Sequence, residues 1–268
     1  NKKIQNKEKN ETNETLLKAT QIGQRVAELY LDPYTANYLI DCLKKTTTKK
    51  ANYISKANDF PFIHMISNTL EMRPLINARK AEYEMIQEKL VLESDNLLSD
   101  EPDVYSEEYE EFEASIKTAI VFEEWTNEVT EEQLLEKYNV TPGEISAKLN
   151  KADWLMMSCY EFCKLLNLRE TGNKILKIRT RLSYGVKEEL LVLLKLKGIG
   201  RIRARKLFQN KIKDLGDIKT ADITTLTMIL GNKLAIDVKK QIGQEYADDK
   251  IQVKPNKRKG QISLNDYG

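Results

Sequence analysis

Apolar residues recur every three or four positions along most of the chain, as at Ile22, Val26 and Leu29. This spacing places them on one face of an α-helix. Residues that start helices precede several such segments, for example Thr130 with Gln133 three residues later. The sequence therefore predicts an all-α fold, a multi-helix bundle with helices near 33–45, 60–71, 74–93, 110–127, 130–138, 142–167, 171–182 and 186–197.

Acidic and basic residues are segregated along the chain, although the net charge is only +2. Residues 82–136 contain 19 acidic residues and two lysines, whereas residues 195–219 contain nine Lys or Arg and two Asp. A dense basic stretch suggests a polyanionic partner, but solvated helices also carry charge runs, so charge alone does not decide. No apolar run approaches the roughly 18 residues of a membrane span, and we expect a monomeric cytoplasmic protein without a membrane partner.

The segment LKLKGIGRIRARKLF (194–208) has the pattern of a helix-hairpin-helix unit. Gly198 and Gly200 permit a tight turn in which the backbone approaches a phosphate, and N–H groups at the next helix start can bind its oxygens. The cations that supply the counter-charge are Arg201, Arg203, Arg205 and Lys206. We interpret the unit as one that grips nucleic-acid backbone without reading bases. An ordinary helical hairpin is the alternative.

A second, weaker signal lies about 30 residues further on. Gly231 precedes a predicted helix that carries Lys233, Lys239 and Lys240. The segment fits a degenerate second hairpin, which would close a compact domain, and it fits a plain terminal helix equally well.

Trp154 lies on the predicted helix 142–167, beside a polar stripe. A flat indole near lysines can stack on an unpaired base, and Lys148 and Lys151 are the nearest cations on the N-terminal side. Helical periodicity by itself favours a core tryptophan.

The residues most often used in catalysis and metal binding are sparse in this chain. The single histidine, His64, lies in an apolar helical segment and is predicted to be a packed residue. Cys159 and Cys163 are one helical turn apart, but no nearby Cys or His completes a zinc site. There is no GxxxxGK[ST] loop and no DExH box, so we expect no ATP hydrolysis, no catalytic residue and no cofactor for this chain alone.

Five segments taken together resemble the C-terminal half of archaeal Ski2-like superfamily 2 DNA-repair helicases. They are ATQIGQRVAELYLDPYTA, LEMRPL, KADWLMMS, RTRLSYGVKEELLVL and KGIGRIRARKLF. The resemblance implies a piece of a larger ATP-dependent helicase, whose cofactors would be ATP and Mg. It also implies three units: the end of a winged-helix domain over 1–32, a helical ratchet bundle over 33–186 and a helix-hairpin-helix domain over 187–247.

The resemblance also implies roles for individual residues. Trp154 matches a family tryptophan that stacks on a base of the translocating strand. The family's preceding basic contact is replaced here by Ser146 and Ala147, which leaves Lys148 and Lys151 as candidates. The arginines of the hairpin match an element that holds the emerging strand and restrains unwinding. The implied partner is single-stranded or forked DNA, bound without sequence specificity.

Residues 248–268 are polar and basic, interrupted by Pro255, and are predicted to form a flexible tail. Gln261, Leu264 and Tyr267 have the spacing of a short peptide that recruits a sliding clamp or a replication protein A type factor. A polar tail without a partner is the alternative.

Two other functions remain open from the residues alone. A helix-hairpin-helix DNA glycosylase would need an aspartate soon after the hairpin, and Asp217 lies 17 residues after Gly200. The charge of Asp217 near a helix start explains it more simply. A non-enzymatic scaffold that recruits repair proteins is the other alternative.

Overall fold

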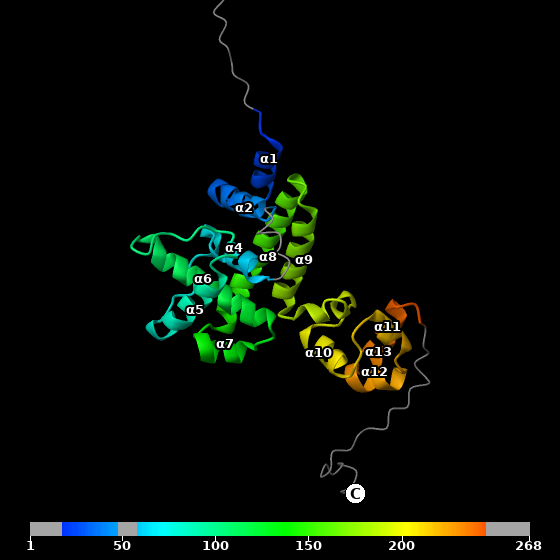
Figure 1. Cartoon of the computed structure of the whole chain (residues 1–268). Coiled ribbons are helices and arrows are strands. Elements are labelled where there is room, and N and C mark those ends of the chain that lie inside the picture. The colour runs from blue at the N-terminus through cyan, green and yellow to red at the C-terminus, as the bar shows by residue number, and fades with distance from the viewer. Residues whose placement is uncertain (1–17, 48–57, 245–268) are drawn as a thin grey trace, which may run out of the picture.

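The computed structural model describes residues 18–47 and 58–244 (Figure 1). Within these ranges the regular elements are α-helices and short 3-10 helices, without a strand. The predicted all-α, multi-helix fold is therefore confirmed for this part of the chain.

Two helices at the N-terminal end pack across one end of the bundle, namely α1 (Gln21–Glu28) and α2 (Pro33–Lys45) (Figure 1). Thr20 and Asp32 precede them, and the side-chain oxygens of both accept backbone N–H groups of the first turn. Such caps satisfy donors that a helix start otherwise leaves unpaired. The predicted start of the helix at 33 is thus correct.

The next elements form one side of the bundle: α4 (Phe60–Ser67), η1 (Leu70–Met72), η2 (Lys80–Glu82), α5 (Tyr83–Glu93), α6 (Glu108–Thr126) and α7 (Glu131–Tyr138). Every residue of α4 is buried, so this helix forms the centre of the packing. Thr130 and Gln133 form the predicted capping box of α7.

The helix predicted from residue 74 begins only at Tyr83. The backbone before it is held in place by α6, because the Ile76 N–H donates to Thr118 Oγ1 at 3.1 Å and Lys117 Nζ donates to the Asn77 carbonyl at 2.7 Å. These contacts span about 40 residues of sequence, so local spacing does not reveal them.

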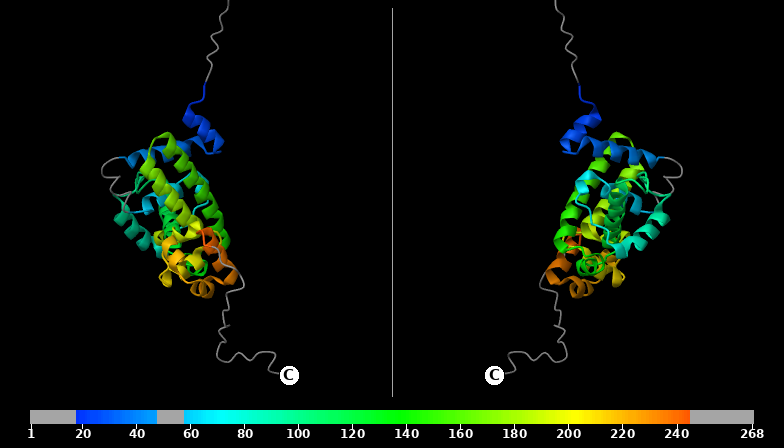
Figure 2. Two further views of the ribbon diagram at one scale, coloured as in Figure 1. Left: turned by 90° about the vertical axis from the view of Figure 1, so that its right-hand side faces the viewer. Right: turned by 90° about the vertical axis from the view of Figure 1, so that its left-hand side faces the viewer.

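The longest helix, α8 (Pro142–Leu165), pairs with α9 (Arg169–Tyr184). Figure 1 and both views of Figure 2 show the two helices side by side through the length of the bundle. Gly172 allows close approach, because a Cβ there would lie 3.3 Å from Cys163 Cβ. The pair is therefore the scaffold that positions residues along the bundle.

The remaining residues form a smaller unit at the end of α9 that lies away from α1 (Figures 1 and 2). Its elements are η3 (Glu188–Leu190), η4 (Leu193–Lys195), α10 (Arg201–Gln209), α11 (Leu215–Thr220), α12 (Ile223–Leu230) and α13 (Asn232–Gln241). The helix predicted over 186–197 is two short 3-10 helices instead, whose leucines point into the core of the unit.

Two separate apolar cores result from this arrangement. The larger core runs from Val26 to Leu182, and the smaller one runs from Val186 to Val238. His64 is fully buried in the larger core, where Nε2 lies 2.9 Å from Ser115 Oγ and Nδ1 lies 3.3 Å from Ser99 Oγ. Burial lowers the pKa of His64 to about 3, so the ring is neutral in the folded protein. The structure therefore agrees with its prediction as a packed residue.

Candidate nucleic-acid interface

Trp154 lies on α8 at the edge of the larger core, and its indole is only partly buried. The indole Nε1–H donates to the Leu29 carbonyl at 3.0 Å, at the end of α1. Next along the chain, Tyr30 has a φ of 55° and is 90% exposed. The indole is thus anchored by its nitrogen at the corner between α1 and α2, and the side chain packs against the larger core while remaining partly exposed.

The two lysines predicted beside Trp154 bind the backbone that follows η1. Lys148 is only 5% exposed, and its Nζ donates to the Pro74 carbonyl. Burial lowers the pKa of Lys148 below its ordinary value. Lys151 is partly buried and donates to the Arg73 carbonyl at 2.8 Å. Both lysines therefore fix this loop to α8, and Lys151 is the more accessible cation.

Arg179 of α9 is a cation that contacts α8 at Asp153 and Met157, on either side of Trp154 in the sequence. Its guanidinium forms two hydrogen bonds with Asp153, at 2.7 and 2.8 Å, and lies 3.3 Å from Met157 Sδ. The hydrogen bonds from Arg179 lower the pKa of Asp153. Asp153 and Arg179 lie 26 residues apart on the consecutive helices α8 and α9, so the helical spacing within α8 does not reveal this pairing.

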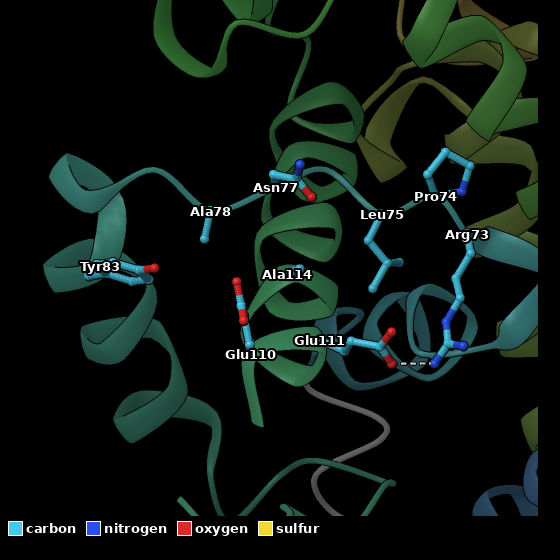
Figure 3. Close-up of a pocket in the computed structure, with 9 residues that line it drawn as sticks. All are labelled: Arg73, Pro74, Leu75, Asn77, Ala78, Tyr83, Glu110, Glu111 and Ala114. Atoms are coloured by element: carbon cyan, nitrogen blue, oxygen red, sulfur yellow. Dashed lines mark hydrogen bonds and ion pairs between the residues drawn. The ribbon is translucent and has the colours of Figure 1, made fainter. Parts of the chain in front are cut away.

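An open pocket lies between α6 and the chain that follows η1, and Figure 3 shows its lining. Glu111 projects from α6 toward Arg73 and forms an ion pair with it, whereas Glu110 lies on the side of α6 that faces Tyr83. Two carboxylates against one guanidinium make this pocket a poor place for a phosphate. We therefore leave it out of the candidate interface.

The predicted hairpin turn has the packing that its residue types indicated. Gly198 has a φ of 83°, and a Cβ there would meet Leu234 Cδ1 at 2.7 Å, so the position favours glycine. Ile199 and Ala204 are buried in the smaller core. Gly200 is the N-cap residue of α10 and has open space where a side chain would begin. The turn therefore packs tightly on α13 and leaves the start of α10 accessible.

Two of the hairpin arginines contact the bundle. The Arg201 guanidinium lies over the Trp125 ring, 4.6 Å from its centroid, and donates to the Val129 carbonyl at 2.9 Å. Arg205 donates twice to Glu128, at 2.7 and 2.5 Å, and also pairs with Glu189 at 2.8 Å. We call the contacts of Arg201 and Arg205 with Trp125, Glu128, Val129 and Glu189 the joint.

The pKa values at the joint reflect this pairing. Burial acts to raise the pKa of Glu128, but hydrogen bonds from Arg205 and from the Lys187 backbone outweigh it and lower that pKa. The hydrogen bonds that Arg205 donates to Glu128 and Glu189 raise the pKa of Arg205. Both groups therefore remain charged, and each neutralises the other.

The other two hairpin cations are exposed. Arg203 Nη1 donates to the Gly198 carbonyl at 2.9 Å, and Lys206 extends from the solvent side of α10. The four cations predicted as one cluster thus divide, with Arg201 and Arg205 in the joint and Arg203 and Lys206 at the surface. The partner-binding residues Gln261, Leu264 and Tyr267 lie outside the described residues.

Asp217 contributes to the start of α11. Its Oδ2 accepts the Lys213 N–H at 2.7 Å, and its own N–H donates to Asp214 Oδ1 at 2.8 Å. These contacts agree with its interpretation as a charge at a helix start.

Neither a metal centre nor a membrane segment is evident in the part of the chain that the structure describes. Its His, Cys, Asp and Glu side chains form no group of three or more that could hold a metal ion. None of the described helices is long and apolar enough to cross a membrane. Burial raises the pKa of the Cys42 and Cys163 thiols to about 12, so both are protonated.

Comparison with known proteins gives a consistent result. The family model described as archaeal helicase, domain 4, matches residues 60–185. The ATP-dependent DNA helicase Hel308 of Methanococcus vannielii is 36% identical over 238 residues, which cover 87% of this chain and 30% of that protein. Hel308 of Pyrococcus horikoshii is 34% identical over 244 residues, 90% of this chain and 32% of that protein.

The relative from Methanocaldococcus jannaschii, also an ATP-dependent DNA helicase Hel308, is 33% identical over 232 residues. That match covers 87% of this chain and 18% of the relative. The chain therefore spans less than a third of the length of these three relatives.

Proposed function

The chain belongs to the archaeal Ski2-like helicases and corresponds to a C-terminal part of such a protein, and we propose that it grips single-stranded DNA there without reading sequence. In this proposal residues 33–186 are the ratchet bundle and residues 187–247 are the helix-hairpin-helix domain. Residues 1–32 are the end of a winged-helix domain. The whole helicase would bind ATP and Mg and act on forked DNA.

The observation that carries the proposal is the position of Trp154 on α8. The indole is anchored through its nitrogen to Leu29, yet it is only partly buried. Lys151 lies one turn before Trp154 on α8, whereas Arg179 of α9 is already paired with Asp153. A partly open aromatic ring one turn from a lysine suits a base of any sequence, because every base has a flat face to stack.

The test is DNA binding by variants at Trp154. Trp154→Ala should weaken binding of single-stranded oligothymidylate by about 1–3 kcal/mol, which stacking on one base contributes. Trp154→Phe should retain most of the affinity, because it keeps an aromatic face and loses only the hydrogen bond to Leu29. Tyr105→Ala is the matched control, since Tyr105 is an aromatic residue that is 98% exposed in the loop before α6.

The outcome that contradicts the proposal is equally specific. If Trp154→Ala lowers the melting temperature and leaves DNA affinity unchanged, the indole is a core residue and does not contact the strand. The role of the tail as a recruitment peptide for a clamp or a replication protein A type factor is a separate proposal from the sequence. Calorimetry with a peptide of residues 257–268 tests it.

A further inference from the structure

A groove of the C-terminal unit lies between α10 and α13. We call it the hairpin groove. It is lined by residues of α10, the end of α12 and α13 along its length, among them Arg203, Gly231, Lys233, Leu234, Asp237 and Lys240. The groove therefore contains the weaker second turn at Gly231 and one cation of the predicted hairpin, Arg203.

The segment that precedes α10 is fixed to α13. The Lys197 N–H donates to Gln241 Oε1 at 2.8 Å, and Gln241 Nε2 donates to the Lys197 carbonyl at 3.1 Å. The Gly198 turn also packs directly on Leu234. These contacts hold the first turn against α13, so the groove is a preformed feature of the unit.

The side chains of the groove carry an excess of positive charge. Arg203, Lys233 and Lys240 are all exposed, and none of them forms an ion pair with a carboxylate in the described part of the chain. The one acid of the lining, Asp237, accepts a hydrogen bond from Gln241 Nε2 at 3.1 Å. The lining of the groove thus has three solvent-exposed cations and only one carboxylate.

This arrangement contrasts with the joint. Arg201 and Arg205 are directed toward the bundle, and Arg205 is already neutralised by Glu128 of the bundle and by Glu189 of η3. A DNA phosphate would have to displace those carboxylates before it could reach Arg205. The cations of the groove need no such exchange, so they are the better phosphate ligands.

We propose that the hairpin groove, through Arg203, Lys233 and Lys240, binds the phosphate backbone of a DNA strand, whereas Arg201 and Arg205 hold the C-terminal unit on the bundle. This inference rests on the proposed function and adds a second place at which the strand is held. Long cationic side chains around an open groove can pair with the phosphates of a DNA strand. Such contacts do not depend on the base sequence.

The experiment compares two triple variants with the same loss of charge. The groove variant is Arg203→Gln, Lys233→Gln and Lys240→Gln. The control variant is Lys195→Gln, Lys213→Gln and Lys219→Gln, at exposed positions of the same unit outside the groove lining. Binding of labelled oligothymidylate is measured by fluorescence anisotropy at several salt concentrations, beside thermal melting.

We expect the groove variant to flatten the slope of log affinity against log salt by about 0.7 for each phosphate that the groove no longer binds. The control variant should change the slope much less, and both should melt close to the wild-type protein. Equal slopes for the two variants would overturn the groove as a site. So would binding of a polyglutamate peptide at the groove with an affinity above that for DNA.

The experiments distinguish a wrong assignment of the groove from a wrong proposed function. If the wild-type chain binds DNA and Trp154→Ala weakens that binding, the proposed function stands whatever the groove variant does. Arg205→Gln completes the test, because it should loosen the joint and leave the salt slope unchanged. A slope reduction as large as that of the groove variant would show that Arg205 contacts DNA.

Discussion

Single residues in the larger core determine how the protein responds to acid. His64 is the only histidine of the chain, and it is neutral and fully buried between two serine hydroxyls. Its pKa of about 3 in the folded state lies below the unfolded value of about 6.5. The unfolded chain therefore binds the proton more readily, and stability is lost as the pH falls below about 6.5.

The resulting prediction concerns denaturant unfolding at two pH values. Between pH 7.5 and pH 5 the unfolding free energy should fall by about 2 kcal/mol, which is the linkage expected for this pKa difference. His64→Gln should be less stable at pH 7.5 and should lose most of this pH dependence. A wild-type protein equally stable at pH 7.5 and pH 5 would show that the imidazole is protonated in the folded state.

A second residue-scale prediction concerns the pair of Arg205 and Glu128. The two side chains are only 24% and 15% exposed and share two hydrogen bonds, so their coupling should be strong for an ion pair. A double-mutant cycle with Arg205→Gln and Glu128→Gln should give a coupling of about 1–3 kcal/mol. The exposed pair of Lys177 and Glu188 is the control and should give about 0–1 kcal/mol. Equal couplings would contradict the assignment of Arg205 to the joint.

At the scale of helices and turns, the end of α9 depends on a glycine. Gly185 has a φ of 63°, and a Cβ there would lie 2.6 Å from Trp125 Cε2 and 2.9 Å from Arg201 Nη1. Gly185→Ala should therefore cost about 1–3 kcal/mol of stability, through backbone strain and displacement of the indole. Gly143→Ala is the control, because that position in α8 has open space and should change stability little. Urea unfolding measures both, and equal effects would contradict the close packing at Gly185.

The sequence predicts most of the helices. It does not predict local structure that depends on contacts with residues far away in the sequence. The starts at Pro33, Glu131 and Pro142 are correct because their caps are local. The helix predicted from residue 74 is wrong because Lys117 and Thr118 hold the preceding backbone. Spacing also detected the cations of the hairpin, but their division into joint and surface depends on Glu128, which is 77 residues from Arg205.

At the scale of the whole molecule, two apolar cores are connected through a polar joint. The smaller core closes on itself, so the C-terminal unit should stay folded when the joint is broken. Lys187 lies in the connection, and its N–H donates to Glu128 Oε1 at 3.2 Å. Because Arg205 of the joint holds the same carboxylate, we expect that breaking the joint exposes the backbone at Lys187.

Limited trypsin digestion tests this arrangement. The double variant Arg201→Ala and Arg205→Ala should be cut at Lys187 faster than the wild-type protein, because Glu128 and Trp125 lose their partners. The released C-terminal unit should resist further digestion, since every residue of its core except Val186 lies after the cut. Unchanged cleavage at Lys187, or immediate loss of the unit, would contradict a self-contained unit held by these arginines.

The two tryptophans of the chain provide an optical readout of these events. Trp125 lies under the Arg201 guanidinium at the joint, and Trp154 lies at the proposed strand contact. Trp154→Phe leaves one emitter that reports on docking of the C-terminal unit, and Trp125→Phe leaves one that reports on the bound strand. Stopped-flow fluorescence of the two variants would therefore show whether the unit moves before, with or after arrival of the DNA.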